Sequence, residues 1–218
     1  MPKVHRRKRL RYPGAALPYT AKAFLPYVAA LGQLALAWNN LHEVLGLLFC
    51  RVMEANPVNQ YLAIWHALKV DRAQREILLA ALRNHVRGAY PTSFVPDIEW
   101  ICNRADALED TRNDALHSPL WAQERGPGNT IVQPWVGLGH IRAQKLLNKD
   151  LLAEFRWCRD AAVLLADFAS DIDLSLADYM RPWPQRPSWP GRPQTNGQKP
   201  RHPVRLAKRP RPPRSSRA

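Results

Sequence analysis

Three side chains that could act together on a phosphodiester lie within the six residues RNDALH, at Arg112, Asn113 and His117. A histidine can move a proton near neutral pH, and the planar fork of an arginine fits a phosphate group. Asn113 and His117 are four residues apart and share one face of a helix, so the carboxamide can hold the imidazole. Arg112 points roughly 140° away from His117, so its long side chain has to bend toward it.

The position of Arg112 is unusual for its helix. Ile98, Ile101, Ala105 and Leu108 form an apolar stripe, and Arg112 occupies the next place on that stripe. Arg75 repeats the pattern beside Leu78, Leu79 and Leu82. A buried guanidinium without a partner costs several kcal/mol, so each arginine must be paired or must line a cavity.

Glu43 is the expected partner of Arg75 or Arg112, because it is the one carboxylate within a leucine-rich helix. A purely structural interpretation also stands. In that interpretation Arg112 pairs with Glu43 or Asp114, and His117 is an ordinary residue at a helix C-terminus, where the dipole favours it.

The periodicity of apolar residues predicts an all-α fold, an up-and-down bundle of four main helices plus a short one. The main helices are expected at 27–53, 70–86, 96–117 and 151–176, and the short one at 61–69. Asp71 with Gln74 has the spacing of a capping box, Asp150 should cap the last helix, and Ser118–Pro119 should end the helix that carries Arg112. The segments TIV and WVGLG predict a small β-hairpin before the last helix. No internal repeat is recognised.

Charge divides the chain into three parts. Of the 32 Lys and Arg residues, seven lie in 1–22 and eleven in 181–218, and neither segment holds an acid. The middle, 23–180, keeps 14 bases against all 18 acids, a net charge of −4. We therefore expect a basic N-terminal arm at 1–22, a helical body at 23–180 and a disordered tail at 181–218, which carries half of the 20 prolines.

The tail has two interpretations. It could be an electrostatic arm for RNA, or a solvated segment without a dedicated partner. In either case, removal of 181–218 is expected to leave the melting temperature nearly unchanged, because a disordered segment buries little surface.

The remaining composition predicts no cofactor, metal or membrane span. Cys50, Cys102 and Cys158 lie far apart, one per helix, and are expected to be small core residues rather than disulfides or zinc ligands. His42, His66 and His85 lie on different helices and lack ligand spacing. No apolar run reaches the ~20 residues of a membrane helix, so a cytoplasmic location is expected.

The RNDALH segment resembles the R-N-x-x-x-H signature of the HEPN superfamily, helical bundles in which this signature closes the third main helix. The resemblance covers about 27–178. It implies a metal-independent endoribonuclease of toxin or defence type, with His117 as acid and base, Arg112 as phosphate clamp and Asn113 as orienting group.

The resemblance also implies a homodimer with the two motifs facing one cleft, and an antitoxin or nucleotidyltransferase as partner. A helix that is apolar on more than one side also predicts a homodimer, which would bury Leu36 and Leu47. The alternative function is a non-catalytic helical module that binds nucleotide, RNA or a protein.

Overall fold

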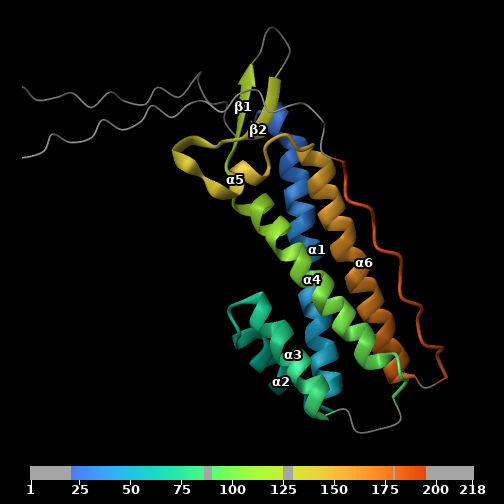
Figure 1. The fold of residues 1–218 in the computed structure, drawn as a ribbon. Helices are drawn as coiled ribbons and strands as arrows, with labels where there is room; N and C mark the ends of the chain where they lie inside the picture. Colours follow the sequence, from blue (N-terminus) through green and yellow to red (C-terminus); the bar gives the residue numbers. More distant parts are fainter. Residues whose placement is uncertain (1–20, 86–89, 125–129, 179, 195–218) are drawn as a thin grey trace, which may run out of the picture.

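Three long helices, α1, α4 and α6, lie side by side along the length of the molecule (Figure 1). The computed structural model describes residues 21–85, 90–124, 130–178 and 180–194. The helices are α1 (Leu25–Val52), α2 (Val58–Ala67), α3 (Asp71–His85), α4 (Phe94–His117), α5 (Ile141–Lys145) and α6 (Leu151–Ala177). The strands are β1 (Leu120–Glu124) and β2 (Thr130–Pro134), and single 3-10 turns lie at Lys22–Phe24 and Gly137–Gly139. The predicted all-α bundle, with a hairpin before the last long helix, is confirmed.

The core forms where the apolar stripes of α1 and α6 meet. Leu34, Leu41 and Leu45 of α1 are fully buried, as the stripe predicts. The matching face of α6 is rich in alanine, and these small side chains allow the two helix backbones to approach closely. α2 docks against α1 at Gly46, where a β carbon would lie only 3.0 Å from the ring of Trp65.

The ends of the helices follow local chemistry in most places. α4 stops at His117, and Ser118 is extended (φ −88°, ψ 124°), because the residue before Pro119 avoids the helical region. The carboxylate of Asp150 accepts from the backbone N–H of Ala153 at 3.1 Å and caps α6 as expected. The predicted capping box of Asp71 and Gln74 is wrong, because both side chains bind residues of other helices instead.

Two segments were predicted to form the hairpin, TIV and WVGLG, and only the first is a strand. β1 and β2 pair antiparallel, with Ala122 opposite Val132, so the segment TIV forms a strand as expected. The segment WVGLG does not, because its two glycines turn the chain. Gly139 has a φ of 76°, and the ring of Trp135 folds over Gly137, where a β carbon would collide with it. The short helix α5 was not predicted.

The C-terminal segment is ordered further than its composition indicates. Residues 181–194 run in an extended conformation along the outside of α6 (Figure 1) and also contact α4, which corrects the expectation that disorder begins at 181. The reason is specific: Arg186 and Arg192 of this segment form ion pairs with the buried acids Asp97 and Glu154. We call residues 183–194 the strap. The rest of the predicted tail and residues 1–20 of the basic arm lie outside the described residues.

The cysteines behave as small apolar side chains. Cys50, Cys102 and Cys158 are buried free thiols, which confirms that they are core residues. Burial raises the pKa of Cys102 and of Cys158 to about 12, so both thiols are protonated at neutral pH. Within the described ranges, none of the helices combines the length and the apolar character needed to cross a membrane.

Candidate active site

Arg112 lies near the end of α4, stacked on an indole of α1. Its guanidinium carbon is 5.2 Å from the centre of the Trp38 ring, a cation–π distance. Nη1 donates to Asn113 Oδ1 at 2.8 Å, and Nη2 lies 3.5 Å from Asp71 Oδ2. The same Asp71 oxygen accepts from Trp38 Nε1 at 2.7 Å. Trp38, Asp71 and Arg112 thus form a closed set that joins α1, α3 and α4.

The other two residues of the RNDALH set are less constrained. His117 is exposed at the last position of α4. The predicted contact between Asn113 and His117 is replaced by the bond of Asn113 to Arg112, and no hydrogen bond joins Asn113 to His117 among the described residues. The carboxamide therefore orients the guanidinium rather than the imidazole.

Two polar atoms at this end of α4 lack partners. Arg112 Nε and Ser118 Oγ are buried without a hydrogen bond to any described residue. A buried donor that finds no acceptor costs about 1–3 kcal/mol, so these two atoms are a local cost to stability. The accessible donors of Arg112 are on its Nη atoms: one N–H of Nη1 binds Asn113, Nη2 lies near Asp71, and the side chain is 20% exposed, so an oxyanion could reach a remaining Nη donor.

Arg75 is the centre of a second polar cluster, deeper between α1, α3 and α4. Its Nε and Nη2 donate to Asp106 Oδ1 at 2.8 and 2.6 Å, and Nη2 also donates to Glu109 Oε2 at 2.6 Å. Nη1 lies 3.2 Å from His42 Nε2, and His42 Nδ1 lies 2.9 Å from Gln74 Oε1. These partners fit a neutral imidazole that donates to Gln74 and accepts from Arg75.

The electrostatics of this cluster agree with a neutral imidazole. Burial is the main reason that the pKa of His42 is lowered, and the positive charge of Arg75 adds to it. Gln74 also donates to the backbone oxygen of Trp65 at 3.1 Å, which ties α2 to the cluster. Arg75 is thus a structural residue that organises three helices.

Replacing Arg75 by alanine should lower the free energy of unfolding by about 3 kcal/mol, the lower end of the range for breaking a buried ion pair. The lower end applies because the Arg75 side chain is 1% exposed whereas Asp106 reaches solvent and can be rehydrated. Urea unfolding followed by circular dichroism would measure the change. Arg83→Ala is the matched control on the same helix: its side chain is 67% exposed and lies 3.7 Å from Glu99, so a change under ~0.5 kcal/mol is expected. Equal effects of the two substitutions would contradict the buried role of Arg75.

The partners predicted for the arginines are wrong. The side chain of Glu43 is 62% exposed and lies 3.6 Å from His66 Nε2, because it points away from the face of α1 that holds Trp38 and His42. Asp114 does not pair with Arg112 either. Its buried carboxylate lies 3.2 Å from Arg142 Nη1 and 3.5 Å from Lys145 Nζ, both on α5.

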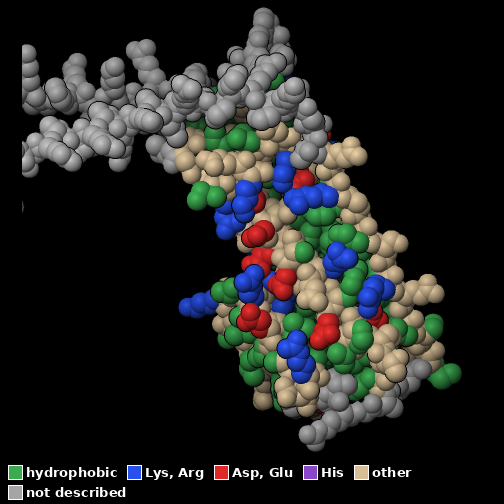
Figure 2. Space-filling model, viewed as in Figure 1, with side chains coloured by type: hydrophobic (Ala, Val, Ile, Leu, Met, Phe, Trp, Pro, Cys, Tyr) green, Lys and Arg blue, Asp and Glu red, His purple; other side chains and the backbone are tan. Residues whose placement is uncertain are grey.

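The short helix α5 brings cations to the end of α4. Arg142 and Lys145 contribute two positive charges against the single carboxylate of Asp114. Elsewhere on this face, Lys and Arg side chains alternate with Asp and Glu over the helices (Figure 2). Arg142 and Lys145 are thus held at Asp114, three residues before His117 on the same helix.

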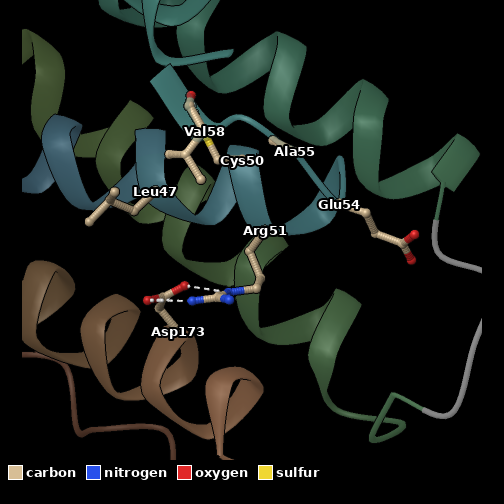
Figure 3. A pocket seen from close by; sticks show the side chains of 7 residues that line it. All are labelled: Leu47, Cys50, Arg51, Glu54, Ala55, Val58 and Asp173. Carbon is tan, nitrogen blue, oxygen red and sulfur yellow. Dashed lines mark hydrogen bonds and ion pairs between the residues drawn. The ribbon is translucent and has the colours of Figure 1, made fainter. Parts of the chain in front are cut away.

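A cavity of about 160 Å³ lies at the other end of the bundle and is separate from these residues. The end of α1, the start of α2 and Asp173 of α6 line it, and Figure 3 shows the ion pair of Arg51 with Asp173 at its wall. No candidate residue reaches it. In the part of the chain that the structure describes, no three His, Cys, Asp or Glu side chains gather closely enough to hold a metal ion.

The sequence interpretation missed Trp38 and Asp71, which hold Arg112, and Asp106 and Glu109, which hold Arg75. A usable signal was present for the second pair, because Asp106, Glu109 and Asn113 recur at helical spacing beside the apolar stripe of α4. Such a polar stripe next to a core face predicts partners for a buried cation.

The arrangement offers an arginine with unused donors, an exposed histidine and two further cations at one end of a helix. These groups can bind an oxyanion and exchange a proton with it. The chain matches no protein-family model, and no curated protein or solved structure is significantly similar to it.

Proposed function

We propose that this protein is a metal-independent endoribonuclease of toxin or defence type. The observation that carries the proposal is the last part of α4, where the partly exposed guanidinium of Arg112 keeps Nη donors beyond its contacts with Asn113 and Asp71 and His117 is exposed at the helix end. The resemblance of RNDALH to the HEPN signature supports the same assignment. The proposal assigns Arg112 to the phosphate, His117 to proton transfer and Asn113 to the orientation of Arg112.

The chemistry needs only these groups. The 2′-hydroxyl of the substrate loses its proton and attacks the adjacent phosphorus, and the 5′-oxygen of the next nucleotide leaves with a proton. A histidine can carry the proton in such a step, a contribution of typically 10²–10⁴-fold in rate. An arginine fork stabilises the charge that builds up on the phosphorane oxygens. The products are a 2′,3′-cyclic phosphate and a free 5′-hydroxyl.

A homodimer would complete the proposed site, as the family resemblance implies. α1 carries a line of exposed leucines, Leu25, Leu36 and Leu47, eleven residues or roughly three turns apart. Leu36 is 71% exposed and Leu47 is 44% exposed. Exposed leucines in such a line are typical of a surface that another chain covers, and we propose that a second copy does so.

The alternative is a non-catalytic helical module that binds nucleotide, RNA or a protein. One observation favours it: the stacking of Arg112 on Trp38 and its ion pair with Asp71 are sufficient structural reasons for the arginine. The two functions differ in one measurable property, the cleavage of RNA.

The test is incubation of the purified protein with total RNA in EDTA. We expect cleavage that persists in the chelator and fragments that end in cyclic phosphate. Such fragments resist polyadenylation until acid hydrolysis opens the ring to a monophosphate and a phosphatase then removes it. RNA binding without any cleavage at protein concentrations that permit dimerisation would favour the non-catalytic module.

A further inference from the structure

The strap is a tandem repeat. Residues 183–194 read WPQ-RPS-WPG-RPQ, four triplets that begin with Trp or Arg and continue with Pro. The first positions are Trp183, Arg186, Trp189 and Arg192, so tryptophan and arginine alternate at every third residue. The period of this repeat is three residues, which matches neither the 3.6-residue period of an α-helix nor the two-residue period of a β-strand.

A three-residue period is that of the polyproline II helix, which places every third side chain on the same face. The exposure of the strap follows that period. All four residues at the third positions, Gln185, Ser188, Gly191 and Gln194, are exposed, and all four prolines are partly buried. Trp183 and Trp189 are partly buried as well, whereas the Arg186 and Arg192 side chains are 42% and 47% exposed and reach the body through their guanidinium groups.

The first half of the strap meets the N-terminal half of α4. Trp183 Nε1 donates to Asp97 Oδ2 at 2.9 Å, and Arg186 Nε donates to Asp97 Oδ1 at 2.9 Å. The guanidinium of Arg186 lies 5.5 Å from the Trp100 ring centre. Asp97 is buried, so both of its oxygens depend on the strap for their partners.

The second half repeats the pattern further along. The Trp189 ring stands edge-on to Trp100 at 6.0 Å, and the Arg104 guanidinium lies 4.9 Å from the Trp189 ring centre. Arg192 Nε donates to Glu154 Oε1 at 2.9 Å, and its guanidinium lies 5.1 Å from the Trp157 ring centre.

The body contacts the backbone of the strap as well as its side chains. Trp157 Nε1 donates to the oxygen of Pro190 at 3.1 Å. An indole N–H directed at a proline carbonyl, beside aromatic rings that pack on the segment, is a recurring way of binding polyproline II peptides. The body thus offers two successive subsites, each with a buried carboxylate and an exposed face of tryptophan.

We propose that the α4–α6 surface is a recognition site for polyproline II segments in which Trp and Arg alternate at every third residue. The strap occupies it as a tethered ligand, and a partner protein with a proline-rich segment of this kind competes for it. The ligand needs arginine because Asp97 and Glu154 are buried acids. It needs a three-residue period because the arginines that reach the two carboxylates, Arg186 and Arg192, are six residues or two turns of a polyproline II helix apart and must lie on the same face.

The charge of the neighbouring surface fits a basic ligand. A hollow of about 330 Å³ lies beside the strap, and Asp160, Asp167 and Asp171 of α6 are among the residues that line it. Arg181, just before the strap, already binds Asp171 at 2.8 Å. This inference does not depend on ribonuclease activity.

The test uses the full chain with Arg186→Gln and Arg192→Gln, which weaken the strap, and a dye-labelled peptide WPQRPSWPGRPQ. Fluorescence polarisation should show saturable binding, tighter than to the unaltered chain, where the tethered strap competes at a high effective concentration. A peptide with one glycine inserted, WPQRPSGWPGRPQ, has the same charge but its second half is rotated by about a third of a turn. It should bind at least about tenfold more weakly, since one charge-assisted contact is lost.

Asp97→Asn in the same background should weaken the binding of the regular peptide and reduce the difference in affinity between the two peptides. If the double variant does not fold, the unaltered chain should rank the peptides in the same order at higher concentration. Equal affinity for the two peptides would mean that binding depends on charge and not on the spacing of the arginines, and would overturn the proposal. So would the absence of saturable binding to a folded strap-weakened chain.

Discussion

Replacing His117 by alanine is expected to abolish EDTA-resistant RNA cleavage and to leave the protein as stable as before. The imidazole is exposed at the end of α4, and truncations at such surface positions usually change the free energy of unfolding by less than ~0.5 kcal/mol. The loss of a proton carrier should lower the cleavage rate by about 10²–10⁴-fold. Single-turnover cleavage of a labelled RNA, with thermal unfolding in parallel, measures both quantities.

Arg112→Ala should also abolish cleavage but should cost stability, because the guanidinium packs on Trp38 and pairs with Asp71. His66→Ala is the matched control: this histidine is also largely exposed, near the end of its own helix, and touches only Glu43 among the described ion pairs. Its cleavage rate should equal that of the unaltered chain. Full activity in His117→Ala would remove His117 from the mechanism. Full activity in both site variants would mean that the cleavage comes from a contaminating nuclease or from another site, and the non-catalytic module would then be the favoured function of this site.

Two truncations should separate the strap from the rest of the tail. A chain that ends at Gln194 should melt at nearly the same temperature as the full chain. A chain that ends at Met180 should melt about 10 °C lower, because Asp97 and Glu154 lose their arginine partners and the apolar contacts of Trp183 and Trp189 with the body are lost, several kcal/mol in all. This replaces the sequence-based expectation that removal of 181–218 leaves the melting temperature nearly unchanged.

Because of the pKa of Glu154, the loss of stability in the second truncation should depend on pH. Burial alone would raise this pKa, but the hydrogen bonds from Arg192 and Lys149 outweigh burial and hold the pKa below its ordinary value. A carboxyl group with a lowered pKa stabilises the fold above its unfolded pKa, and that contribution is lost as the pH falls through the folded one. The difference in melting temperature between the two truncated chains should therefore become smaller at acid pH.

The same pair of chains tests the proposed RNA arm. Eight of the Lys and Arg residues follow Gln194, so the chain that ends there should bind RNA more weakly, with a shallower dependence of log K on log salt. Equal melting temperatures for the two truncations would mean that the strap does not stabilise the body. An unchanged salt dependence would mean that residues 195–218 make no phosphate contacts.

The sequence predicted what depends on one segment at a time. The stripe of α6, the cap at Asp150 and the stop before Pro119 are local, and all three were correct. The two arginines on apolar stripes were also recognised as exceptions. Their partners were not, because a partner is chosen by the packing of two helices. On α1 the step from His42 to Glu43 rotates the side chain by about 100°, from a buried face to solvent.

The strap shows a different limit. Proline-rich composition argues against a packed core of its own, and that argument is sound for an isolated segment. That argument does not apply to a segment that packs against the helical body, as the strap does. The alternation of Trp and Arg at every third residue was the available signal, and it could have been recognised with the polyproline II period.

The ion pair of Arg186 with Asp97 joins residues 89 positions apart, which has a consequence for the order of events during synthesis. Chains emerge from the ribosome N-terminus first, at about 5–20 residues per second, so α4 and α6 can begin to pack before the strap emerges. In that interval the α4–α6 surface is open, Asp97 lacks its arginine partner and Glu154 has only Lys149. We therefore expect the docking of the strap to come last, as the binding of a ligand that the chain itself supplies.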